Sequence, residues 1–261
     1  MSNFKKLVLD IETVGEDFDS LDEATQENLT RWIKKESENE AEYDEALDEL
    51  KNGLGFSALT AEIVAIGVLD CDRDEGVVYF QAPGENLGEF SAKDGSPSSV
   101  AKPLRRTGAS GGKEKNTTFK QCSEKEMLEK FWEGAKKYNY FITFNGRAFD
   151  IPFMMVRSAV HGVRPTKDLM RGRYLSQQSF DAVHIDLLDQ LTFYGAVRKK
   201  GNLHLWTRAF GITSPKVSGV TGDDVRKLFK EKKYAEIARY NAGDLRATKE
   251  LHEKWENYMK F

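Results

Sequence analysis

Cysteine is scarce in this sequence, which limits what can hold the fold together. The 261 residues include two cysteines, Cys71 and Cys122. Two cysteines are too few for a disulfide framework, and their spacing is not that of a metal site. We therefore expect two free thiols in a reducing compartment, which favours the cytoplasm.

Long apolar runs are also missing. No stretch approaches the roughly 20 apolar residues that a membrane-spanning helix needs. The first residues, MSNFKKLVLD, lead straight into a strand-like run, without the basic, apolar and small-residue zones of a signal peptide. The sequence predicts a cytoplasmic protein with no membrane partner.

The chain has little excess of either charge, with a net charge of −3. Two regions of the chain differ in charge, however. Residues 1–60 hold 16 acids and 6 bases, a balance of −10, whereas residues 141–240 hold 9 acids and 17 bases, a balance of +8. The basic region 141–240 is a candidate surface for binding phosphate groups.

The most informative stretch that is present is LVLDIET, Leu7–Thr13. Its apolar residues predict a short strand buried on both faces. Asp10 and Glu12 are two residues apart, so both would point to one face of the sheet. Two adjacent carboxylates in a buried strand favour a divalent cation between them. The alternative is that Asp10 caps a turn and Glu12 is solvated at the strand end.

Other apolar runs predict a mixed sheet of five strands with helices on both faces, an α/β fold. The further strands are expected at 62–69, 76–81, 138–144 and from Val183, and the first two would complete an antiparallel meander with Leu7–Thr13. Helices are expected after a capping box at Ser123 and Glu126, and over Asp150–His161, 203–210, from Thr221 and over 234–259.

Two segments interrupt this pattern. Residues 16–58 are acidic and rich in helix formers, which predicts a helical insertion on the surface. Residues 91–118 are rich in Gly, Ser, Pro and Lys and have almost no apolar residues, which predicts a flexible loop. We therefore expect a single domain, 1–261, with two insertions.

Three motifs in fixed order carry a family resemblance. They are Asp10-Ile11-Glu12, then Asn145 to Asp150 in NGRAFD, then Tyr240 to Asp244 in YNAGD. The chain resembles the DEDD-type 3′–5′ exonucleases of the ribonuclease-H-like fold, in particular those related to the proofreading domain of family B DNA polymerases. Because Arg239 stands where the other subclass has its histidine, the resemblance is to the Tyr subclass.

The resemblance implies a role for each motif residue. Two Mg²⁺ or Mn²⁺ ions would be held by four carboxylates, and a tyrosine would orient the attacking water. The metal ligands would be Asp10, Glu12, Asp150 and Asp244, with Tyr240 completing the catalytic set and Thr13, Asn145 and Phe149 holding the terminal nucleotide.

The implied activity is metal-dependent removal of nucleoside 5′-monophosphates from a 3′ end. A single strand is the expected partner, and no protein partner follows from the sequence. The resemblance favours DNA over RNA, although no residue separates the two. An exoribonuclease and a catalytically silent nucleic-acid-binding protein are the alternatives.

A basic cluster follows the second motif. We expect the strand to pass over it, and its members are Arg164, Lys167, Arg171 and Arg173. The four histidines lack metal-ligand spacing, and we expect Asp186 to make structural hydrogen bonds.

Overall fold

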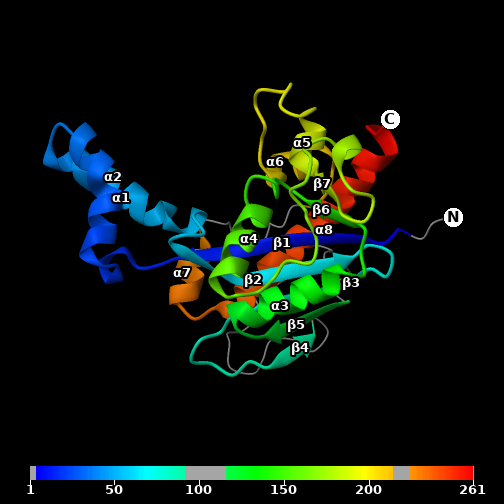
Figure 1. Cartoon of the computed structure of the whole chain (residues 1–261), viewed down its shortest axis with the longest axis horizontal. Helices are drawn as coiled ribbons and strands as arrows, with labels where there is room; N and C mark the ends of the chain where they lie inside the picture. The colour runs from blue at the N-terminus through cyan, green and yellow to red at the C-terminus, as the bar shows by residue number, and fades with distance from the viewer. Residues whose placement is uncertain (1–3, 92–115, 214–223, 261) are drawn as a thin grey trace.

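The core of the protein is a mixed sheet, which a computed structural model describes over residues 4–91, 116–213 and 224–260 (Figure 1). Within these residues the sheet has seven strands in the order β4-β5-β3-β2-β1-β6-β7. They are β1 (Lys6–Gly15), β2 (Ala61–Asp70), β3 (Glu75–Phe80), β4 (Glu89–Ser91), β5 (Thr117–Gln121), β6 (Tyr140–Thr143) and β7 (Val183–Asp186). The predicted α/β class and mixed sheet are confirmed, but the count of five strands is wrong.

The two missed strands, β4 and β5, flank and partly overlap the segment that the sequence assigns to a loop. Each is short, and β5 pairs in parallel with β3, so no hairpin signal marks it. The rings of Phe90 and Phe119 stack 4.9 Å apart across this edge and cover the sheet there. Residues 92–115 of the predicted flexible loop lie outside the described residues.

The centre of the sheet follows the prediction. β1, β2 and β3 form an antiparallel meander, while β6 and β7 run parallel to β1. The carboxyl ends of β1, β6 and β7 therefore meet at one edge. β6 pairs with β1 only over Lys6–Val8, so beyond the end of β6 at Thr143 β1 is paired with β2 alone.

Helices cover both faces of the sheet (Figure 1). α3 (Glu124–Ala135) and α4 (Asp150–Val160) pack with Leu9 and Ile11 on one face, and the capping box at the start of α3 is confirmed. α8 (Tyr234–Tyr258) covers the other face, together with α5 (Leu187–Leu191), α6 (Leu203–Ala209) and α7 (Val225–Lys230). The start predicted at Thr221 lies outside the described residues.

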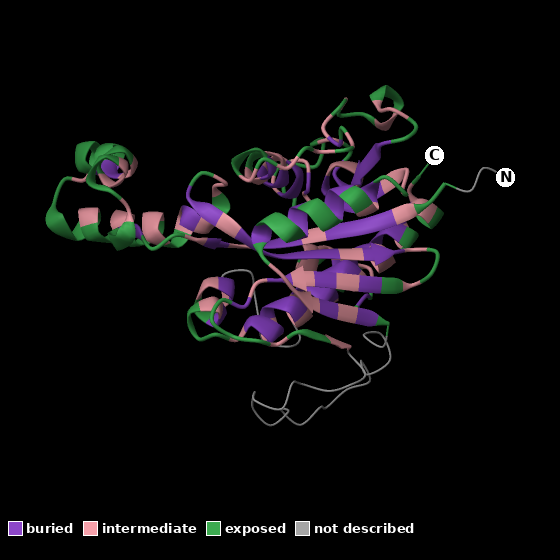
Figure 2. Ribbon diagram, turned by 60° about the horizontal axis from the view of Figure 1, so that its bottom comes forward, coloured by how far each residue is buried: buried purple, intermediate pink, exposed green. Residues whose placement is uncertain are grey.

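Residues 16–58 leave the sheet as a helical hairpin, which we call the acidic hairpin. It consists of α1 (Glu23–Glu36) and α2 (Glu40–Gly53), flanked by the 3-10 turns η1 (Phe18–Ser20) and η2 (Leu54–Phe56). The pair projects away from the body, and α2 buries none of its residues (Figures 1 and 2). The predicted helical character of this segment is confirmed. That they are an insertion into a single domain stays a prediction.

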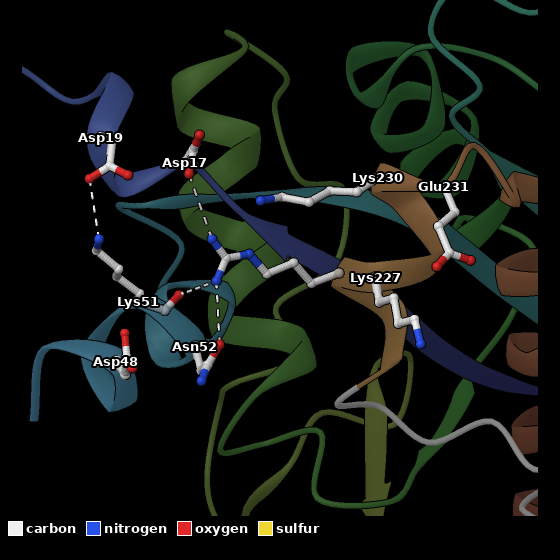
Figure 3. Close-up of a pocket in the computed structure, with 9 residues that line it drawn as sticks. Asp17, Asp19, Asp48, Lys51, Asn52, Lys227, Lys230 and Glu231 are labelled. Carbon is white, nitrogen blue, oxygen red and sulfur yellow. Dashed lines mark hydrogen bonds and ion pairs between the residues drawn. The ribbon is translucent and has the colours of Figure 1, made fainter. Parts of the chain in front are cut away.

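The base of the acidic hairpin meets α7 around a cavity of about 560 Å³ (Figure 3). Arg226 spans the junction: it donates to the Lys51 carbonyl at 2.7 Å and lies 3.8 Å from the Asp17 carboxylate. The lining of the cavity has four acids and four bases, so the cavity offers no excess positive charge to a polyanion. We interpret this junction as the attachment of the hairpin to the body.

Among the described helices, none is both long and apolar enough to cross a membrane.

Candidate active site

The acids of β1 face α8. Val8 and Val14 pack on the α8 side of the sheet, whereas Leu9 and Ile11 pack against α3 and α4. Side chains alternate along a strand, so Asp10 and Glu12 belong to the α8 side. A register shift follows directly after Glu12, where the pairing with β2 slips by one residue. Such bulges re-aim the backbone, and they are over-represented beside active sites.

A glycine on β2 lets α8 approach these acids. Gly67 pairs with Asp10, and a Cβ atom built on Gly67 would lie 1.9 Å from Asn241 Oδ1. The adjacent position on this face is Ala65, opposite Glu12. Small residues therefore leave the space that brings Asn241 against the strand, and Asn241 Nδ2 donates to Asp10 Oδ2 at 2.8 Å.

Three carboxylates meet in this space, and we call Asp10, Glu12 and Asp244 the carboxylate cluster. One oxygen from each lies within 4.8 Å of the others, with Glu12 and Asp244 buried and Asp10 half-buried. Loss of solvation raises the pKa of Asp10 and of Glu12, and the neighbouring carboxylates raise both further. In residues 4–91, 116–213 and 224–260, no lysine or arginine is found in an ion pair with Asp10 or Glu12, and none is among the main causes of their pKa shifts.

Asn241 is a site residue that the sequence did not reveal. Its Oδ1 is buried and has no hydrogen-bond partner among the described atoms. A buried polar oxygen without a partner is costly, so its place beside the carboxylate cluster calls for a specific reason. Its position directly after Tyr240, on the helix that carries Asp244, is the one signal that could have identified it.

Asp150 lies beside the carboxylate cluster rather than within it. It is the first residue of α4, and its Oδ1 accepts a hydrogen bond of 3.1 Å from the N–H of Ile11. The Ile11 N–H is available for this bond, rather than for a strand partner, because β6 ends before it reaches this part of β1. Burial raises the pKa of Asp150 to about 7, with Asp186 and Asp244 contributing repulsion. Asp150 therefore joins the second motif to the strand that carries the first.

The turn from β6 into α4 is held by Asp186. Its carboxylate accepts hydrogen bonds of 2.9 Å from the N–H groups of Asn145, Arg147 and Leu188. Asn145 lies in the left-handed region with a φ of 66°, a conformation that asparagine tolerates better than most residues. The expected structural role of Asp186 is confirmed, and Asn145 is fixed at the carboxyl end of β6.

Tyr240 lies four residues before Asp244 on α8 and is half-buried. Burial raises the pKa of its phenol, and the carboxylates of Asp244, Glu12 and Asp10 raise it further. The hydroxyl therefore stays protonated beside the carboxylate cluster at any physiological pH. Four of the five predicted catalytic residues thus surround one space, and the fifth, Asp150, is joined to it through Ile11.

The remaining predicted residues, Thr13 and Phe149, lie at the edge of this space. Thr13 Oγ1 donates to the Gly55 carbonyl at 2.7 Å, which holds the end of the acidic hairpin against β1. The ring of Phe149 is half-buried and lies 6.3 Å from that of Phe56, which is 67% exposed. Their contact with a nucleotide stays a prediction.

The predicted basic cluster is partly engaged within the protein. Arg173 pairs with Asp189 at 2.7 Å, and Lys167 donates to the Asp181 carbonyl at 2.7 Å. Arg164 and Arg171 are exposed. None of the four histidines, all within described segments, belongs to the carboxylate cluster.

Residues 108–260 match the model of a family described as predicted 3′–5′ exonucleases related to the exonuclease domain of PolB. The chain belongs to this family. The comparison with curated proteins finds no match. The matched region includes α4, α8 and the motifs that carry Asp150 and Asp244. Asp10 and Glu12 lie before it, and the fold brings both to Asp244.

Proposed function

We propose that the chain is a metal-dependent 3′–5′ exonuclease that releases nucleoside 5′-monophosphates from the end of a single strand, with DNA preferred to RNA. Family membership supports a nuclease that acts from a 3′ end. The observation that carries the proposed metal dependence is the carboxylate cluster, three largely buried acids within 4.8 Å.

The donor atoms of this site suit Mg²⁺ or Mn²⁺. Both ions prefer oxygen ligands, and the site offers a carboxylate oxygen from each of three residues, all within 4.8 Å of one another. Asp10, Glu12 and Asp244 would hold one ion, and Asp150 would help to hold a second. When bound, the two ions would stabilise negative charge on the attacking and the leaving oxygen.

The chain's own groups supply the remaining steps. The raised pKa of Tyr240 keeps its hydroxyl protonated, so that it can hydrogen-bond a water and orient it for in-line attack. Asn145, held rigidly by Asp186, and Phe149 would position the terminal nucleotide. Thr13 would keep the backbone after Glu12 in place through Gly55.

A substrate panel tests the proposal. Single-stranded DNA and RNA of one sequence, labelled at the 5′ end, are incubated with Mn²⁺ and either the wild-type chain or Asp10→Asn. We expect a ladder of DNA products shortened from the 3′ end, together with 5′-mononucleotides, and no ladder with the variant. Internal cleavage would contradict the proposal. Faster loss of RNA would identify an exoribonuclease, and binding without products would identify a silent binding protein.

A further inference from the structure

A strained aromatic turn follows α5. Phe193 and Tyr194 both lie in the left-handed region, with φ of 50° and 57°, and Gly195 follows with φ of 97°. Residues with bulky side chains rarely adopt this conformation, and two in succession are rarer still. Packing does not account for the conformation of Phe193, since its ring is 55% exposed. Strain of this kind is often found where function requires a particular presentation of a side chain.

Several contacts fix this turn. The N–H of Tyr194 donates to the Asp189 carbonyl at 2.6 Å, and Gln190 Nε2 donates to the Tyr194 hydroxyl at 2.8 Å. The ring of Tyr194 lies 4.6 Å from the ring of Tyr174, which is 47% exposed. Phe193 and Tyr174 are therefore held as two exposed aromatic surfaces on a rigid support.

Exposed cations lie close in sequence to both rings. Arg171 precedes Tyr174 by three residues, and Arg198, Lys199 and Lys200 follow the turn, all four exposed. No ion pair to these four cations is found within the described part of the chain. The nearby acid Asp189 is already paired with Arg173. The surface thus combines aromatic faces with uncompensated positive charge, the combination that unpaired nucleic acid recognises.

This surface adjoins the edge of the sheet that carries the carboxylate cluster. β7 ends at Asp186, whose carboxylate holds the Asn145 turn, and α5 then leads directly to Phe193. Neighbouring strands are spaced by about 4.8 Å, so the end of β7 lies roughly 10 Å from β1. Arg147 adds a second connection: its guanidinium donates to the Met170 carbonyl at 2.8 Å, just before Arg171.

We propose that this surface binds single-stranded nucleic acid a few nucleotides behind the 3′ end. The bases would stack on Phe193 and Tyr174, while Arg171, Lys199 and Lys200 would contact the phosphates. Stacking needs unpaired bases, so a duplex would not use this surface. The polarity, with the 3′ end at the carboxylate cluster, rests on the proposed function.

Binding to the full chain tests the proposal directly. The probe is a fluorescent oligothymidylate in EDTA, followed by anisotropy with wild type, Phe193→Gly and the pair Lys199→Glu/Lys200→Glu. Each variant should raise the Kd by about fivefold to a hundredfold, and the charge reversals should also flatten its salt dependence. Unchanged Kd values, or equally tight binding of a duplex, would overturn the proposal.

The Phe193→Gly variant separates function from folding. Glycine adopts a positive φ without strain, so the melting temperature should stay level or rise while binding weakens. Phe180→Gly, at a 75% exposed aromatic near the opposite end of β7, is the matched aromatic control. Lys34→Glu/Lys35→Glu, an exposed lysine pair on α1, is the matched charge control. Neither control should change the Kd.

Hydrolysis separates this inference from the proposed function. The rise in KM for Phe193→Gly should grow from a trinucleotide to a long oligothymidylate, because the trinucleotide is too short to cover both sites. An equal loss on the two substrates would overturn the binding surface and leave the exonuclease assignment in place. Wild-type binding without hydrolysis of either substrate would instead overturn the proposed function alone.

Discussion

The carboxylate cluster and the acidic hairpin place the same chemical groups in opposite environments. Residues 16–58 contain 14 acids and 4 bases, and most of their side chains are exposed. There, two hydrogen bonds from Thr25 lower the pKa of Asp22, and solvent screens its charge. In the cluster, burial and mutual repulsion raise the pKa of Asp10 and of Glu12. Location, rather than the number of acids, identifies the candidate site.

The largest expected effect follows from neutralising one acid in each region. Asp244→Asn keeps the shape of the side chain but removes a proposed ligand charge, so hydrolysis should fall at least about a thousandfold. Asp44→Asn makes the same change on the exposed surface of α2 and should leave the rate unaltered. Single-turnover hydrolysis of a labelled strand in Mn²⁺ measures both. Equal rates for the two variants would remove the functional distinction between the regions.

The two regions should also respond differently to pH. The Asp150 carboxyl holds a proton in the folded chain from about pH 4, where free carboxyls titrate, up to its raised pKa of about 7. The contribution of Asp150 to the free energy of unfolding should therefore fall as pH rises through this window, by about 1–3 kcal/mol in EDTA. Buried His184 and His252, each with a pKa lowered to about 4, contribute in the opposite direction below about pH 6.5. Mn²⁺ at a hundred times its Kd should restore about 2.7 kcal/mol at high pH.

Denaturant titrations across this range test the pH prediction. Asp10→Asn should flatten the pH dependence, because it removes one of the repelling charges, whereas Asp44→Asn should leave it as in the wild type. A pH dependence that is the same in Asp10→Asn as in the wild type would show that the carboxylate cluster is not the source of this effect.

Much of this contrast could be predicted from the sequence. The run LVLDIET specifies a buried strand, and its period of two places both acids on one face. Pro152 marks the first turn of α4, so the position of Asp150 at its start follows as well. These predictions depend on local rules that neighbouring residues determine.

The rest depends on contacts between distant segments. In the sequence, Gly67 is only an unfavourable residue within a predicted strand. Its role becomes clear where α8 crosses β2 and needs the space that a side chain would fill. The hydrogen bond from Ile11 to Asp150 exists because β6 is shorter than β1, which no local pattern indicates. The left-handed Phe193 and Tyr194 run against residue preference, so the sequence alone would not place a turn of this kind there.

The close approach of α8 to β2 offers a smaller, structural test. Gly67→Ala would place a methyl group 1.9 Å from Asn241 Oδ1 and 2.8 Å from Leu245 Cδ1, so both side chains would have to move. We expect a loss of about 1–3 kcal/mol in stability and a fall in hydrolysis. Gly134→Ala in α3, where a Cβ atom meets nothing within 4 Å, should instead stabilise the chain slightly.

A second change tests the cause of that loss. Asn241→Ala combined with Gly67→Ala removes the nearer clash, so part of the stability should return. Hydrolysis should not, because the hydrogen bond to Asp10 is then absent. Recovery of both would mean that Asn241 only occupies space.

The smallest effect is expected where the two regions join. Arg226→Ala removes the hydrogen bond to the Lys51 carbonyl and the ion pair with Asp17, contacts at a partly exposed junction worth about 1 kcal/mol in total. Amide hydrogen exchange should become faster in α1 and α2 and stay unchanged in β1 and α8. The stabilisation by Mn²⁺ should also persist, because none of the proposed ligands contacts Arg226. A variant that loses the Mn²⁺ effect would show that the acidic hairpin and the carboxylate cluster are one cooperative unit, and the contrast between them would then describe two parts of a single site.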